Sequence, residues 1–256
     1  MPFAEHARAV DDAARFVKAI APFSATAALS VPEAYKVQAL SLRLRLDRGE
    51  KPVGARIGLT SRAEKIQMGG ADPIWAWLTD AMLIEDGGLI DLACFIRPRV
   101  APGIAFVLKR PLEGRVSLAE AMGAVETVAP AMAIIDSRYD APPPCLSDMI
   151  ADNAGSAGFV LGPWNRPDTD LRDLGMVVLS AGRPVQIGSA AAILGHPARA
   201  LMAASRLGAQ FGSRLEAGSI LLAGAPAAAE VLRPPLHLRV DVETLGSAGL
   251  STAPPA

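Results

Sequence analysis

An arginine beside a glycine turn is the feature of the sequence best suited to hold a ligand. Arg56 lies in the segment GARIGLTS, where Gly58 allows a close backbone approach and Thr60 and Ser61 offer hydroxyl groups. The guanidinium of arginine stays protonated, and its planar fork of N–H donors matches a carboxylate. The segment therefore predicts a binding site for an acidic ligand.

Five other polar positions in apolar surroundings have structural interpretations. Asp136 and Arg138 lie two apart at a predicted strand end, where an ion pair or a loop clamp is commoner than acid–base catalysis. Asp152 and Asn153 are expected to tie a loop through hydrogen bonds from their side chains to the backbone. His196 precedes a proline, so we expect its ring to bond the backbone of a turn rather than to act in catalysis.

The composition of the chain limits its partners and its location. The 256 residues carry 25 basic and 26 acidic side chains, so no general electrostatic attraction to nucleic acid or to an anionic membrane is expected. No apolar run reaches the roughly 18 to 20 residues of a spanning helix, and the amphipathic start does not resemble a signal peptide. Cys94 and Cys145 lack metal-binding spacing and are expected to be buried thiols. We therefore predict a cytoplasmic protein.

The elements that must position these residues form an α+β pattern. Residues 1–50 predict a helical N-terminal arm, whose second helix starts near Pro32, and residues 51–250 predict a mainly β domain that carries the pocket. Helices are expected over residues 116–128, opened by a capping box at Ser117 and Glu120, and over residues 196–212. A hairpin turn is predicted at 181–182, and residues 251–256 are expected to form a disordered tail.

Several segments in order resemble one known family from about residue 32 to about residue 249. They include GARIGLTSRAEKIQMGGADPIWAWL, IRPRVAPGIAFVLKRPLEG, PAMAIIDSRY, MIADNAGSAGFVLG and LGHPARA. The chain resembles the 2-oxopent-4-enoate hydratase and 4-oxalocrotonate decarboxylase family, within the fumarylacetoacetate hydrolase superfamily. The resemblance implies a mixed, strongly bent β-roll with flanking helices. It also implies chemistry on 2-hydroxydienoates or 2-oxo acids with Mg²⁺ or Mn²⁺, and Ile74 is more similar to the decarboxylase branch.

The chain departs from this family at the residues that would hold the metal. The resemblance implies glutamates at three positions, which here are Ala101, Gly103 and Ala133. Side chains two apart on a strand project to one face, where carboxylates can hold a hard cation and a methyl group or a hydrogen cannot. We therefore expect no metal cofactor, and the spare acids Glu126 and Asp91 do not lie on that strand face.

Among the other positions that match the family, some keep the family's residue and some do not. Arg56 stands where the family has a lysine, so it cannot act as a general base but can still bind a carboxylate. The segment 223–225, Ala-Gly-Ala, replaces a turn that contributes a hydroxyl group in the family, and Ala81 replaces an acidic neighbour of Asp80. The matched residues that remain are Leu59, Thr60, Ser61, Asp80, Asp136, Arg138 and Ser156.

These replacements suggest a repurposed pocket, larger and drier, lined by alanine and glycine. The first hypothesis is a metal-independent lyase- or isomerase-type enzyme acting on a small 2-oxo acid or an enolic, partly apolar ligand. Arg56 and Asp80 would be its catalytic residues, and its substrate contacts would be Leu59, Thr60, Ser61 and Ser156. The second hypothesis is a non-catalytic subunit that stabilises or regulates an active relative. A homo-oligomer is expected, with a hydratase or decarboxylase paralogue as another candidate partner.

Overall fold

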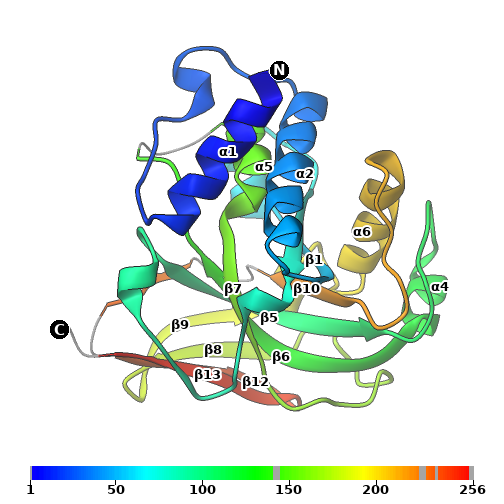
Figure 1. Ribbon diagram of the computed structural model, residues 1–256. Helices are drawn as coiled ribbons and strands as arrows, with labels where there is room; N and C mark the ends of the chain where they lie inside the picture. The colour runs from blue at the N-terminus through cyan, green and yellow to red at the C-terminus, as the bar shows by residue number, and fades with distance from the viewer. Residues whose placement is uncertain (1, 141–144, 225–228, 234–235, 254–256) are drawn as a thin grey trace.

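The helical arm packs on one side of the molecule. The computed structural model describes residues 2–140, 145–224, 229–233 and 236–253. Helices α1 (Pro2–Arg15) and α2 (Val31–Asp47) form the arm, with the short α5 (Leu146–Ala151) beside them (Figure 1). As expected, α2 begins with a proline in its first turn, and Ser30 and Glu33 form its capping box. The buried Gln38 donates hydrogen bonds to the Trp75 and Ile150 carbonyls, which ties the arm to the β domain.

The larger sheet curls into a roll. Its strands follow the order β2-β1-β10-β5-β6-β7-β3, and β11 pairs with β5. Although β2 and β3 lie at opposite ends of this order, only the 3₁₀ turn η2 (Asp80–Met82) separates them in sequence, so the sheet must bend back on itself. Its strands are β1 (Pro52–Gly58), β2 (Ile74–Thr79), β3 (Leu83–Ile84), β5 (Arg99–Leu108), β6 (Val125–Ile135), β7 (Ser156–Leu161), β10 (Ile220–Gly224) and β11 (Glu230–Val231).

A second sheet of five strands lies against the roll, on the side away from the arm (Figure 1). Its order is β4 (Gly88–Ile90), β13 (Gly246–Thr252), β12 (Leu236–Val242), β8 (Gly175–Ser180) and β9 (Arg183–Ser189). The predicted hairpin joins β8 to β9, and Ala181 and Gly182 both adopt positive φ angles, 47° and 76°. Two positive φ angles are what a tight two-residue hairpin turn requires.

The remaining helices are short apart from α6 (Arg199–Gln210). The capping box of Ser117 and Glu120 opens α4 (Leu118–Gly123), as predicted. The helix expected to reach residue 128 nevertheless ends at Gly123, because Val125 already pairs with Leu108 of β5. The other short elements are α3 (Arg62–Gln67), η1 (Phe23–Ala25), η3 (Leu92–Cys94), η4 (Asn153–Gly155) and η5 (Ala190–Ala192).

Three further expectations about the chain can be compared with the structure. Ser251 and Thr252, expected in a disordered tail, instead belong to β13 and pair with β12 and β4, while residues 254–256 lie outside the described part. The thiols expected to be buried are not, since Cys94 is exposed and Cys145 is half-buried. Among the described helices, none combines the length and the apolar character needed to cross a bilayer.

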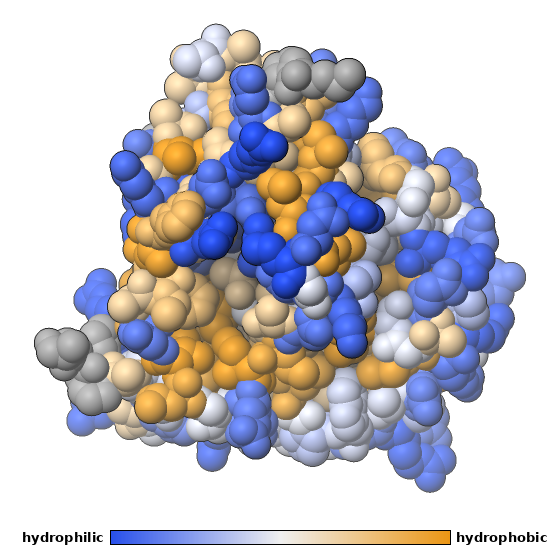
Figure 2. Space-filling view, in the orientation of Figure 1, coloured by the Kyte–Doolittle hydropathy of each residue, from blue (hydrophilic) through white to orange (hydrophobic). Residues whose placement is uncertain are grey.

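Two apolar clusters stabilise the fold. The larger one fills the space between the sheets and under the helices. The smaller one lies inside the roll, and four of its eight buried members are the alanines Ala105, Ala129, Ala131 and Ala133. Figure 2 shows apolar residues gathered across the middle of one face, between the arm and the second sheet. Half of the buried members of the smaller cluster are therefore small alkyl groups, and the other half are larger apolar side chains.

Candidate active site

The three positions expected to carry glutamates lie side by side. Ala101 of β5 is the direct cross-strand partner of Ala133 of β6, and Gly103 pairs with Ala131 one step along the same face. Ala101 and Ala133 are buried, with 2% and 6% of their surface exposed. No group of three or more His, Cys, Asp or Glu residues that could hold a metal occurs in the part of the chain that the structure describes. Alkyl groups offer no oxygen ligand, so the residues at this place do not fit a divalent cation.

Backbone atoms also close the space beside Gly103. A Cβ atom added there would lie 2.7 Å from the Ala223 carbonyl oxygen and 3.1 Å from the Gly224 Cα atom. Both atoms belong to the main chain of β10, which cannot move aside as a flexible side chain can. A side chain at position 103 is therefore excluded unless β10 shifts.

We expect Gly103→Ala to destabilise the protein by about 1–3 kcal/mol, because the added methyl group overpacks the contact with β10. Thermal or denaturant unfolding of the variant measures the loss. The matched control is Gly175→Ala in β8, where the nearest atom to an added Cβ is Glu243 Oε2 at 3.5 Å, an ordinary contact. Equal stability of Gly103→Ala and the wild-type protein would contradict the described packing.

Arg56 extends from β1 across the inside of the roll. Its guanidinium donates from Nε to the Ser156 hydroxyl at 2.9 Å and from Nη2 to the Ala154 carbonyl. Its Nη1 has no hydrogen-bond partner among the described residues and lies 3.7 Å from the place of a Cβ on Gly58. One edge of the guanidinium is thus held by the protein, and Nη1 is its one nitrogen without a hydrogen bond to the described residues.

The positive charge of Arg56 has no ion-pair partner in the described part of the chain. The residue is 5% exposed and forms no ion pair with any described carboxylate. Burial lowers the pKa of Arg56 to about 10; Glu64 opposes this shift and the nearby Arg138 adds to it. A buried cation without a partner is costly, so this position favours the binding of an anionic group.

A run of left-handed residues presents the partners of Arg56. Asn153, Ala154 and Gly155 have φ angles of 51°, 50° and 67°. The Asn153 side chain accepts from the Trp77 N–H at 2.7 Å and donates to the Trp77 carbonyl at 2.9 Å, as a neighbouring strand would. Asn153 thus joins β2 to the segment before β7, and Arg56 joins β1 to Ser156 at the start of β7. We expected Asn153 only to tie a loop, and Ala154 was missed because a carbonyl acceptor leaves no mark in the sequence.

A second buried arginine, Arg138, contacts the same segment before β7. Arg138 forms an ion pair with Asp152 and also donates to the Asp136 carbonyl at 2.7 Å and to the Ser156 carbonyl at 3.4 Å. Its carboxylate partner is therefore Asp152, not Asp136. The Asp136 carboxylate accepts from the backbone N–H groups of residues 96 and 97, at 2.9 and 2.6 Å, which confirms the loop clamp. Burial raises the pKa of Asp152 to about 6, against the opposing attraction of Arg138.

The GLTS segment lies at the end of β1, with its polar atoms engaged inside the protein. Leu59 is buried and has a φ angle of 55°. The Thr60 hydroxyl donates to the Gly224 carbonyl. The Ser61 hydroxyl accepts from the Glu64 N–H at 3.2 Å and forms the capping box of α3. A ligand role for these residues stays a prediction, since each hydroxyl already has a structural partner.

Asp80 is placed apart from Arg56. It follows Thr79, which pairs with Pro52, whereas Arg56 pairs with Ala76 further along the same two strands. The exposed Asp80 carboxylate accepts from the N–H groups of residues 51 and 81, both at 2.9 Å. The structure thus brings Arg56 and Ser156 together but does not bring Asp80 to them, and its catalytic role stays a prediction.

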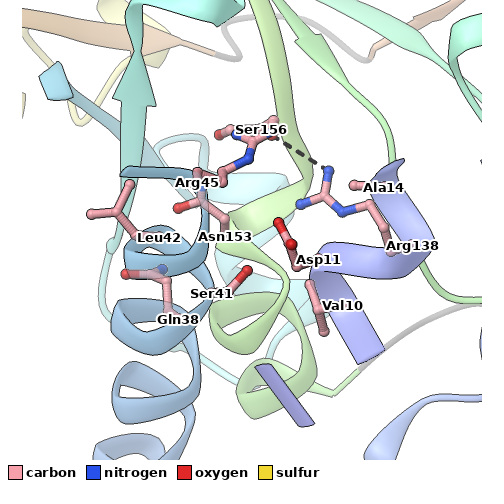
Figure 3. A pocket seen from close by; sticks show the side chains of 10 residues that line it. All are labelled: Val10, Asp11, Ala14, Gln38, Ser41, Leu42, Arg45, Arg138, Asn153 and Ser156. Carbon is pink, nitrogen blue, oxygen red and sulfur yellow. Dashed lines mark hydrogen bonds between the residues drawn. The ribbon is translucent and has the colours of Figure 1, made fainter. Parts of the chain in front are cut away.

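Two sequence interpretations can be compared directly. The His196 ring accepts at Nδ1 from the Ala198 N–H at 3.1 Å, which confirms the turn role. The larger alanine- and glycine-lined pocket involves Ala225, which lies outside the described residues, and stays a prediction. A small cavity of about 20 Å³ does adjoin the site between the arm and the start of β7. Figure 3 shows Arg45 and Arg138 pointing into it beside Ser156, and its size allows about one water molecule.

Comparison with known proteins identifies the fold and the family of the chain. The family model for the fumarylacetoacetate hydrolase C-terminal region matches residues 78–250. A 4-oxalocrotonate decarboxylase from a Pseudomonas species is 50% identical over 98% of both chains, and a 2-keto-4-pentenoate hydratase from Paraburkholderia xenovorans is 33% identical over 95% of this chain and 92% of its own. The solved 4-oxalocrotonate decarboxylase from Pseudomonas putida G7, complexed with magnesium and adipate, superposes with a TM-score of 0.95 at 32% identity, covering 98% and 97% of the two chains.

The curled sheet and its flanking helices define a fold of the fumarylacetoacetate hydrolase type. The chain belongs to the 2-oxopent-4-enoate hydratase and 4-oxalocrotonate decarboxylase family within that superfamily. Its relatives are decarboxylases and hydratases, which supports a lyase-type activity.

Proposed function

We propose that the protein is a metal-independent enzyme of the lyase or isomerase type, acting on a 2-oxo acid or an enolic, partly apolar substrate. The observation that carries this proposal is Arg56, a buried guanidinium on the same sheet face as Leu222, whose Nη1 and positive charge have no hydrogen-bond or ion-pair partner among the described residues. Such a site stabilises negative charge through a fixed cation in a dry environment.

In this proposal Arg56 holds the carboxylate or the enolate oxygen of the substrate, and it remains protonated throughout. Ser156 keeps the guanidinium in place through its hydrogen bond with Nε. Leu59, Thr60 and Ser61 contribute the wall and the turn at the end of β1. Asp80 moves a proton; because its carboxylate now bonds backbone N–H groups at the surface, this role requires the end of β2 to rearrange.

A second candidate is a non-catalytic subunit that stabilises or regulates an active hydratase or decarboxylase. The observation that favours it is the internal engagement of Thr60, Ser61 and Asp80, each of which already has a structural hydrogen bond. Both candidates fit a cytoplasmic protein and a homo-oligomer. Exposed apolar side chains such as Leu83, Leu89 and Ile187, at 50%, 68% and 78% exposure, are candidates for subunit contacts.

Calorimetry tests the proposed function with 2-oxopentanoate as a stable probe. We expect this acid to bind with the same affinity in EDTA and in excess Mg²⁺, and we expect Mg²⁺ or Mn²⁺ alone to produce no heat of binding. Binding that requires either cation would contradict metal independence. Absence of any binding under both conditions would favour the non-catalytic subunit.

A further inference from the structure

The outward face of α6 combines arginines with apolar side chains. Met202 and Ala203 lie three and four residues after Arg199, and Arg206 lies four and three residues after them, so the four side chains share one side of the helix. The other face, which includes the fully buried Leu201, packs toward the roll. Packing of the buried side therefore fixes the helix, and the side that carries Arg199 and Arg206 faces outward.

A hollow lies between this face and the segment that leads from β5 to α4. Its volume is about 400 Å³, and its lining combines Met202 and Ala203 with Val116 from that segment. A second hollow of about 370 Å³ shares Arg115 and Arg206 with the first. Ligand pockets commonly have volumes of about 300–1,000 Å³, so the space is large enough for a small organic molecule.

Three guanidinium groups line the first hollow, and its lining residues include no carboxylate. Arg115 has no ion pair or hydrogen bond among the described residues. Arg199 donates one bond, to the Leu194 carbonyl at 3.0 Å. Arg206 lies 3.6 Å from a carboxylate oxygen of Asp72, whose side chain is 79% exposed, so this pair is weakly held. Most of the N–H donors of the three groups are thus available.

We propose that this hollow binds an organic acid that has an apolar body and two anionic groups. Arg199 and Arg206 are two helical turns apart, about 10 Å along α6, and Arg115 faces them from the adjoining segment. Two anions can therefore be bound at separate guanidinium groups while the apolar body lies over Met202 and Ala203.

Calorimetric titration with terephthalate, benzoate and benzyl alcohol tests the proposal, with phenyl phosphate to separate carboxylate from phosphate recognition. Because Arg56 also attracts acids, the titrations are made in Arg56→Met protein and repeated in the wild-type chain. We expect terephthalate to bind about tenfold or more tightly than benzoate, and benzyl alcohol not to bind. The double variant Arg115→Met/Arg206→Met should lose at least about tenfold in terephthalate affinity.

The matched control is Arg183→Met, an exposed arginine on β9, which should leave the terephthalate affinity unchanged. Circular dichroism establishes that each variant is folded; loss of the fold is not expected, because Arg115 is exposed and Arg206 is only half-buried. Equal affinity of the double variant and its parent would overturn the proposal, as would equal binding of benzyl alcohol and terephthalate. Failure of every anionic probe to bind would also overturn it.

Discussion

Replacement of Arg56 by methionine should weaken the binding of 2-oxopentanoate by about 30-fold or more. Loss of one partner from a buried, hydrogen-bonded charge pair costs about 2–5 kcal/mol, which corresponds to that factor at its lower end. Methionine preserves much of the length of the side chain but offers no donor to an anion. Calorimetry with the variant measures the effect, and the neutral ketone 2-pentanone should bind both proteins equally.

The control for this result is Arg62→Met, an exposed arginine in α3 close to the same turn. It should bind 2-oxopentanoate as the wild-type chain does, because it lies outside the roll. Unfolding curves distinguish lost binding from lost structure, since Arg56→Met also removes the bonds to Ser156 and Ala154. A folded Arg56→Met protein with full affinity would disprove the role of the guanidinium.

Anion binding at Arg56 should also depend on pH in one direction. Its pKa is lowered to about 10 by burial, so the side chain is a cation below that pH and loses its charge above it. The affinity for 2-oxopentanoate is therefore expected to be constant from neutral pH to about 9 and to fall as the pH rises through 10. A titration series shows this; an affinity that does not change up to pH 11 in folded protein would argue against Arg56 as the anion partner.

Replacement of Arg138 by methionine should destabilise the fold by about 3–5 kcal/mol at pH 8, because the change leaves Asp152 as a buried carboxylate without a cation. The Asp136 and Ser156 carbonyls also lose a donor. Denaturant unfolding at pH 8 measures the loss. The exposed pair of Arg166 and Asp168 provides the control, and Arg166→Met should leave the unfolding curve unchanged.

The sign of the pH effect follows from the pKa of Asp152, which burial raises to about 6, above its ordinary value of 3.8. Without Arg138 that pKa rises further, and the folded state holds the proton more tightly than the unfolded state. The free energy of unfolding of the variant therefore decreases as the pH rises through the folded-state pKa of Asp152. Arg138→Met should be less destabilising at pH 5 than at pH 8, and the reverse order would refute the ion pair as its cause.

The elements with strong local signals could be predicted from the sequence. The capping box at Ser117, the proline start of α2 and the hairpin at Ala181 depend on residues close in the chain, and the structure has them all. The register between two strands depends on tertiary structure and not on local sequence. The neighbouring location of Ala101 and Ala133 could still be expected, because the family resemblance assigns both positions to one metal site.

The partners of the polar side chains could not be predicted in the same way. Asp136 and Asp152 both lie near Arg138 in sequence, and only the folded backbone decides which carboxylate the guanidinium meets. Backbone acceptors such as the Ala154 carbonyl are invisible to side-chain patterns. Asp80 is exposed because it directly follows the end of β2. Tertiary packing, which local sequence does not reveal, decides whether a residue at a strand end is exposed.

The contact between Gly103 and the main chain of β10 has an evolutionary consequence. A single substitution cannot place an acidic side chain at position 103 without displacing the neighbouring strand, since the main chain of β10 fills the space. Variation at position 103 is therefore expected to be limited to glycine unless a second change first moves β10.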